Sequence, residues 1–185
     1  MNLFLCYDEQ MQEYITEALV LDKEEKGELD ELVTLFTPHL GKVVAKIMSG
    51  KKITSKLSGH LEPGYHTHVR LIQKNAIHIG DALKRAMHTR DMSILRLVKA
   101  MTYEHHSDPD LWRALKEKSD GKKLLTIFGF DAESAMCYIC NVREPAYFVF
   151  QDAMYCCNQC FPGTLSLNEY YKLPLSEKKE NRYTK

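Results

Sequence analysis

Five of the six cysteines in this 185-residue chain lie between Cys137 and Cys160. Four of them form two Cys-x-x-Cys pairs separated by sixteen residues. A turn of this length directs both sulfurs of a pair toward one ion, and a second such turn completes a tetrahedron of thiolates, which Zn²⁺ accepts. We therefore predict one zinc ion held by Cys137, Cys140, Cys157 and Cys160. A site closed by four protein ligands has no position for water or substrate, so its predicted role is structural.

Residues ~125–170 resemble the four-cysteine zinc fingers of the zinc-ribbon and treble-clef type. The resemblance implies that the four matching cysteines are the ligands. Cys156 departs from the pattern, because it precedes Cys157 and could replace it in a slipped register. In a treble clef a helix opens at the second cysteine pair, whereas Phe161-Pro162-Gly163 delays any helix until about Ser166. The ribbon form is therefore favoured, and the two tight pairs flanking a hairpin favour zinc over an iron–sulfur cluster.

Three histidines form a second candidate metal group. His60, His66 and His68 have the spacing H-x₅-H-x-H, and Glu62 lies between them. In an extended segment His66 and His68 point to the same side, as a metal pair requires. An exposed polar loop explains the same residues, so a second metal site stays open.

His105 and His106, with Glu104 and Asp108 nearby, resemble the histidine start of metal-dependent nucleases of the HNH type. They lie about thirty residues before the first cysteine pair, and no matching Asn and His follow. The chain also lacks the GxxxxGK[ST], GxSxG and GxGxxG motifs of phosphate-binding loops, α/β-hydrolases and dinucleotide-binding enzymes. We therefore predict that the protein is not an enzyme.

Charge is distributed unevenly, although the formal net charge is zero. Residues 1–31 contain ten acidic residues and two lysines, whereas residues 42–123 contain seventeen Lys or Arg and eight Asp or Glu. Within the basic region, one face of a predicted helix carries four cations. We predict that this face contacts the phosphates of nucleic acid through Arg70, Lys74, Lys84 and Arg85. The alternative is an ordinary solvated helix face.

The elements that must position these groups are predicted from periodicity. Apolar residues recur at three- and four-residue spacing before residue 120, which predicts helices over about 8–27, 29–36, 38–49, 67–88, 94–101 and 109–115. Beyond residue 120, the segments LLTIFGF (124–130) and AYFVFQ (146–151) are typical of strands, and MYCC (154–157) completes a hairpin. The predicted fold is mainly α. It has a helical domain at 1–120, a zinc-stabilised β-hairpin module at 121–175 and a disordered charged tail at 176–185.

These patterns predict a non-enzymatic, zinc-binding regulatory factor that acts in transcription or another nucleic-acid process. A protein–protein adaptor without nucleic-acid contact is the main alternative, and a metal-dependent nuclease is a lesser one. No segment reaches the ~20 apolar residues of a membrane helix, and the acidic start does not resemble a signal peptide. The expected location is therefore a reducing intracellular compartment, cytoplasm or nucleus. The expected partner is nucleic acid or a protein, with no small-molecule substrate and no membrane.

Overall fold

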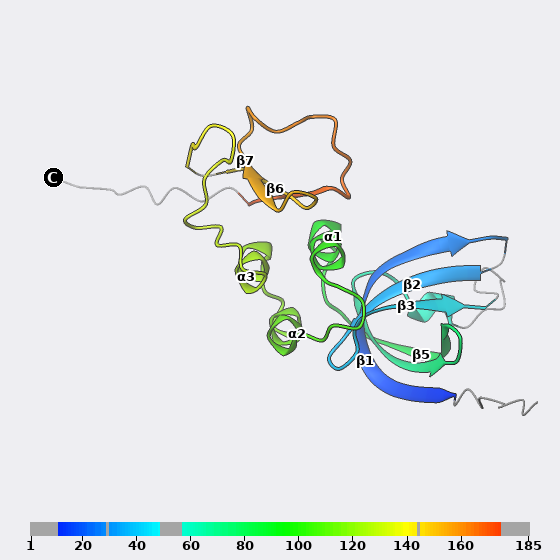
Figure 1. The fold of residues 1–185 in the computed structure, drawn as a ribbon. Helices are drawn as coiled ribbons and strands as arrows, with labels where there is room; N and C mark the ends of the chain where they lie inside the picture. The colour runs from blue at the N-terminus through cyan, green and yellow to red at the C-terminus, as the bar shows by residue number, and fades with distance from the viewer. Residues whose placement is uncertain (1–10, 29, 49–56, 144, 175–185) are drawn as a thin grey trace, which may run out of the picture.

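The computed structural model describes residues 11–28, 30–48, 57–143 and 145–174. Between residues 11 and 90, most of the described residues lie in strands β1 to β5 (Figure 1). The prediction of a mainly α fold is therefore wrong. The elements in chain order are β1 (Gln12–Lys26), β2 (Asp30–Thr37), β3 (Gly41–Ile47), the 3₁₀ turn η1 (Ser58–His60), β4 (Tyr65–Gln73), β5 (Ile77–Met87), α1 (Met92–Met101), α2 (Pro109–Lys116), α3 (Gly121–Ile127), β6 (Tyr147–Val149), β7 (Met154–Cys156) and β8 (Tyr170–Lys172).

The first five strands close into a barrel in the order β1-β2-β3-β5-β4, with β4 pairing back to β1. All pairs are antiparallel except β3 with β5, which meet in parallel at Lys46 and His78. A small five-stranded closed barrel of this kind is the architecture of the OB-fold.

The barrel strands alternate between an interior and an exterior face. In β4, Thr67, Val69 and Leu71 are buried, whereas His68 and Arg70 are partly exposed. The interior positions of all five strands form one apolar core. Its buried members are Ala18, Val20, Val33, Leu35, Val43, Ala45, Ile47, Leu61, Val69, Leu71, Ile79 and Ala82.

A second core lies outside the barrel. It contains Leu19 and Leu21 from the outer face of β1 and Phe36 from β2. The helices and the three-stranded sheet β7-β6-β8 supply its other buried members, which are Leu95, Leu97, Val98, Leu111, Ala114, Leu115, Leu124, Leu125, Phe148, Tyr155, Tyr171 and Leu173. The second core therefore joins the barrel, the helices and the cysteine-bearing segment.

These two cores explain why strands were predicted as helices. Strands β1 and β2 bury parts of both faces, so their apolar residues are contiguous and also satisfy a three- and four-residue spacing. The segments predicted as helices over 8–27, 29–36, 38–49 and 67–88 contain β1 to β5 wherever the structure describes them. The helix with Arg70, Lys74, Lys84 and Arg85 on one face therefore does not exist.

Later elements were predicted with mixed success. Helices α1 and α2 are confirmed, and the Asp108 carboxylate caps α2 by accepting from the Leu111 N–H at 2.9 Å. The β6–β7 hairpin is also confirmed, with Phe148 opposite Tyr155. By contrast, the segment 124–130 lies largely in α3, which Asp120 caps, and the helix expected from Ser166 is replaced by β8.

The proposed boundary at residue 120 remains a prediction. The second core includes residues from both sides of it, such as Leu115 and Leu124. The predicted disordered tail at 176–185 lies outside the described residues.

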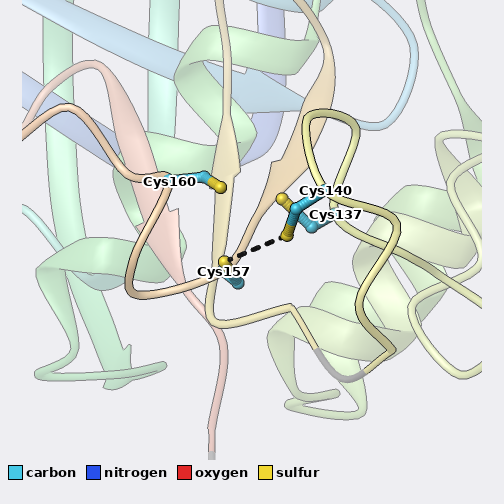
Figure 2. Close-up of side chains that lie close together, drawn as sticks. All are labelled: Cys137, Cys140, Cys157 and Cys160. Atoms are coloured by element: carbon cyan, nitrogen blue, oxygen red, sulfur yellow. Dashed lines mark hydrogen bonds between the residues drawn. The ribbon is translucent and has the colours of Figure 1, made fainter.

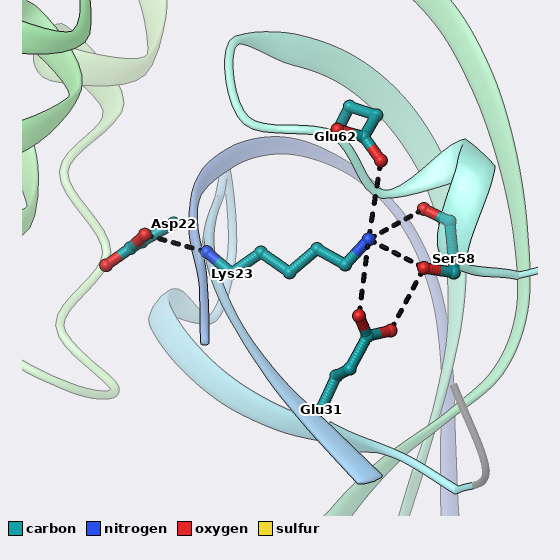
Figure 3. A network of polar contacts seen from close by, with 5 residues as sticks. All are labelled: Asp22, Lys23, Glu31, Ser58 and Glu62. Atoms are coloured by element: carbon teal, nitrogen blue, oxygen red, sulfur yellow. Dashed lines mark hydrogen bonds and ion pairs between the residues drawn. The ribbon is translucent and has the colours of Figure 1, made fainter. Parts of the chain in front are cut away.

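A polar cluster holds η1 against the barrel (Figure 3). Lys23 pairs with Val33, an interior position, and its ammonium lies 3.6 Å from Glu31 and 3.3 Å from Glu62. It also donates to the Ser58 hydroxyl at 2.7 Å, and that hydroxyl donates to Glu31 at 3.0 Å. The cluster therefore ties β1 and β2 to η1.

Helix α1 and the segment after it are anchored on the outer face of the barrel. The Lys99 ammonium contacts Asp22 at 2.5 Å and Glu24 at 2.6 Å, both on β1. From β3, the Lys42 ammonium donates to the carbonyls of Lys99, at 2.8 Å, and of Thr102. These contacts place α1 over part of the outer face of β1, β2 and β3.

Candidate metal centre and nucleic-acid interface

The first cysteine pair lies in a tight turn. The Cys137 N–H donates to the Val142 carbonyl, and the Asn141 N–H donates to the Cys137 carbonyl at 2.8 Å. Asn141 has φ +57°, a left-handed conformation that asparagine tolerates better than most residues. The Tyr138 N–H donates to the Tyr155 carbonyl at 2.9 Å, which docks this turn on β7.

The second pair follows β7 directly. The Phe161 N–H donates to the Cys157 carbonyl at 3.0 Å and closes a turn that contains Cys160. The hairpin β6–β7 thus brings two turns together that are far apart in sequence. The sulfur atoms of four cysteines all lie within 4.8 Å of one another: Cys137, Cys140, Cys157 and Cys160 (Figure 2).

This sulfur arrangement fits a tetrahedral metal ion. With zinc–sulfur bonds of ~2.3 Å, the sulfurs of a regular tetrahedron lie ~3.8 Å apart. The Cys140 and Cys157 sulfurs are already 3.7 Å apart, and no pair exceeds 4.8 Å. Cys156 is not part of the group, because it pairs with Tyr147 inside the β-sheet. The geometry favours Cys157 over Cys156 as a ligand; the identity of the metal stays a prediction.

The four thiols differ in acidity. Burial raises the pKa of Cys137, but hydrogen bonds from the backbone N–H groups of Cys140, Cys157 and Ile139 outweigh burial and lower this pKa to about 6. Hydrogen bonds with Cys140 and Cys157 raise the pKa of Cys160 to about 12. The two shifts favour the thiolate at Cys137 and the protonated thiol at Cys160. A cation bound among the sulfurs would displace thiol protons.

The four predicted nucleic-acid contacts are spread over β4 and β5. Arg70 on β4 lies 3.4 Å from the Glu13 carboxylate and opposite Asp81, so its charge is largely balanced. Lys74 is exposed in the β4–β5 turn. Lys84 lies over the Tyr65 ring, 4.3 Å from its centroid. Arg85 is exposed and lines a separate pocket near α2.

The histidines do not assemble a second metal site. Among the residues that the structure describes, only the cysteine group has three or more metal-ligating side chains close enough to share an ion. His66 and His68 are both on the exterior of β4, whereas His60 Nδ1 accepts from the Lys84 N–H at 3.2 Å. The His106 backbone lies so close to Gly41 that a Cβ there would be 2.0 Å from the His106 oxygen. The His105–His106 segment therefore packs against the barrel.

Sequence reasoning missed the part of the barrel that OB-folds use for binding. In that fold, the β2–β3 face and the loops after β1 and β4 contact oligonucleotides. Here the open part of the face carries Leu32, Val44 and Lys46, and strand register places the β1–β2 and β4–β5 turns at the same rim. Lys26 and Lys74 are exposed at these two turns. Alternation in β2 and β3 would have been the signal, but burial on both faces of β2 concealed it.

Comparison with known proteins agrees with the barrel. Residues 11–83 match the family described as the recombination protein O N terminal. A DNA repair protein RecO of Dehalococcoides mccartyi is 40% identical over 65 residues, which are 35% of this chain and 26% of that protein. The RecO of Roseiflexus sp. is 38% identical over 66 residues, which are 36% of this chain and 23% of that protein. The chain thus spans about a quarter of these two relatives.

A longer but weaker match reaches beyond the barrel. The DNA repair protein RecO of Bacillus pumilus is 26% identical over 189 aligned positions, covering 87% of this chain and 72% of that protein. The matched family is not a zinc-finger family, and its match ends before the cysteines. No helix of the described residues is long and apolar enough to span a membrane.

These comparisons correct two functional predictions. The prediction of a regulatory factor that acts in transcription is wrong, because the matched family and relatives are named for recombination and DNA repair. A nuclear location is not supported, because these relatives come from bacteria. The chain is therefore similar to RecO proteins, in its barrel above all.

Proposed function

We propose that this chain is a DNA recombination and repair protein that binds DNA through its OB barrel and catalyses no reaction. One observation carries the proposal: the family match at 11–83 coincides with the five-stranded barrel, an architecture that binds oligonucleotides in other proteins. The RecO names of the relatives support the process. The proposed location is the bacterial cytoplasm.

The DNA contact is assigned to the rim formed by the β1–β2 and β4–β5 turns. Lys26 and Lys74 are exposed there, and no ion pair is formed by either among the described residues. Helix α1 covers the opposite part of the β2–β3 face through Lys42 and Lys99. The open part presents aliphatic Leu32 and Val44, so contact with phosphates is expected to dominate over stacking on bases.

The four DNA contacts predicted from the sequence remain a proposal, but they differ in how accessible they are to DNA: Arg70, Lys74, Lys84 and Arg85. Lys74 has the best position, at the turn that OB-folds use. Arg70 is balanced by Glu13, and Lys84 lies over Tyr65. Arg85 is accessible but far along β5 from the rim.

Salt-dependent binding tests the proposal. A fluorescent single-stranded oligonucleotide should bind the full chain, with log affinity falling linearly as log salt rises. The double variant Lys26→Glu/Lys74→Glu should bind more weakly to all sequences and reduce the slope by about 1.4, since each lost contact with single strands removes ~0.7. The matched double reversal Lys122→Glu/Lys172→Glu, on α3 and β8, should bind like the wild type. Absence of binding at low salt would refute the proposal.

A structural zinc ion is the second part of the proposal. The four sulfurs match the expected spacing, and a site filled by four thiolates has no open position for catalysis. Bound zinc would fix the two turns on either side of the β6–β7 hairpin. Elemental analysis of the purified chain should find about one zinc per chain. If the protein binds no metal even with its cysteines reduced, this part of the proposal alone is contradicted.

A further inference from the structure

A pocket lies between the β4–β5 side of the barrel and the end of α2, away from the β2–β3 face. Its volume is about 210 Å³. Most of its wall is apolar surface, but six of its nine lining residues have ionisable side chains: Glu17, His66, His68, Arg85, Lys116 and Lys118. None of these residues lies on β2 or β3, so the pocket is separate from the proposed rim.

Positive charge exceeds negative charge in this pocket. Glu17 supplies the one carboxylate of the lining, and it is engaged by the Lys116 ammonium at 2.8 Å and by His68 at 3.4 Å. Among the described residues, Arg85 and Lys118 have no ion-pair partner. The lining therefore holds two uncompensated cations.

The nearby lysines also affect two histidines beside the pocket. Burial, His88, Lys116 and Lys118 lower the pKa of His66 to about 4, and burial with Lys118 lowers the pKa of His88. Both shifts favour the neutral imidazole. The ring centroids lie 5.3 Å apart, and His66 packs edge-on against Trp112 at 5.7 Å.

These two rings also have unmet hydrogen-bonding capacity. The Nδ1 atoms of His66 and His88 are buried and find no partner within the described part of the chain. His88 is only 5% exposed, so solvent does not compensate for the missing partner there. Both Nδ1 atoms lie behind the pocket surface, so the rings would sense a bound anion through its charge, and the two free cations are the groups that would contact a compact oxyanion.

We infer that this pocket binds a phosphate group, with Arg85 and Lys118 as its main charged contacts. The phosphate is either a phosphodiester of a bound nucleic acid or a free phosphate ion. The cavity has room for the group and several waters, each of which occupies ~30 Å³. Glu17 holds Lys116 in place at the pocket wall through their 2.8 Å ion pair.

Imidazole NMR of the full chain tests the inference. Inorganic phosphate, compared with chloride at equal ionic strength, should shift the His66 and His88 ring signals in a saturable way. It should also raise the His66 pKa by at least about one unit, because an anion within ~4–6 Å favours the charged imidazole. Arg85→Gln and Lys118→Gln should each lose these responses, whereas Lys122→Gln should keep them.

The outcomes separate this inference from the DNA-binding proposal. Equal responses to phosphate and chloride, or a full response in Lys118→Gln with an unchanged melting temperature, would overturn it. If a single-stranded oligonucleotide gives the same shifts as phosphate, the source is the nucleic-acid backbone; if only phosphate does, the source is the free ion. DNA binding without any phosphate response refutes the pocket alone. A phosphate response without DNA binding refutes the proposed function alone.

Discussion

Removing the metal should unfold the three helices while leaving the barrel intact. The perturbation is a zinc chelator, or Cys140→Ser, applied to the full chain. The cysteine turns dock on the sheet β7-β6-β8, because the Tyr138 N–H bonds to the Tyr155 carbonyl. That sheet is short, with three residues in each strand, and depends on the turns for its order.

The size of the effect follows from the second core. The sheet contributes Phe148, Tyr155 and Tyr171 to it, and Leu173, directly after β8, is a fourth buried side chain. Burial of each stabilises by about 1.5–3 kcal/mol, so the four together contribute about 6–12 kcal/mol as an upper range. This equals the net stability of a typical domain, about 5–15 kcal/mol. Tyr171 also lies directly against Gly121 at the start of α3, so helix positions depend on it.

Hydrogen exchange measured by mass spectrometry provides the assay. After metal removal, amides of α1, α2 and α3 should exchange close to the unfolded rate, whereas β3, β4 and β5, whose interior residues form a separate core, should keep their protection. Adding zinc back should restore the helices. Unchanged helix protection after complete zinc loss would refute this reasoning and would support an independent unit ending near residue 120.

Three further predictions concern single residues. Lys23→Ala should destabilise the chain by about 3 kcal/mol in urea unfolding, because the 9%-exposed Glu31 loses its ammonium partner; a change below about 0.5 kcal/mol would contradict this role. The His66 pKa is lowered to about 4 from 6.5, so the unfolded chain binds the proton first and stability should fall as pH drops from 6.5 to about 4. Allowing for solvent screening of this half-buried ring, the loss is about 1–2 kcal/mol, and His66→Gln should remove it. Cys156→Ser should retain the metal and Cys157→Ser should lose it, as measured by elemental analysis; the reverse result would place Cys156 in the site.

The sequence was most informative where local chemistry determines local structure. The spacing of the two Cys-x-x-Cys pairs identified side chains that the structure brings within 4.8 Å. The helix predicted over 109–115 is present as α2, because the Asp108 cap and the first-turn Pro109 act locally. The same holds for the hairpin predicted from 146–151 and 154–157, which is present as β6 and β7.

The barrel was missed because its signal depends on tertiary packing. In β4, Thr67, Val69 and Leu71 alternate with polar residues and could have been recognised as a strand. In β2, Val33 and Leu35 face the interior while Phe36 faces the second core, so no alternation remains. The continuous apolar residues of β2 are explained by the helices that cover the barrel from outside, and the sequence does not show this packing. The pocket near α2 was equally hidden, since Arg85 and Lys118 are brought together by the fold.

The two buried faces of β1 restrict where residues can be inserted or deleted during evolution. Ala18 and Val20 belong to the barrel core, whereas Leu19 and Leu21 belong to the second core. Inserting or deleting one residue in the first half of β1 would exchange the two sets and damage both cores at once. Length variation among functional homologues should therefore be excluded from this strand and collect in connections such as the one between β3 and β4.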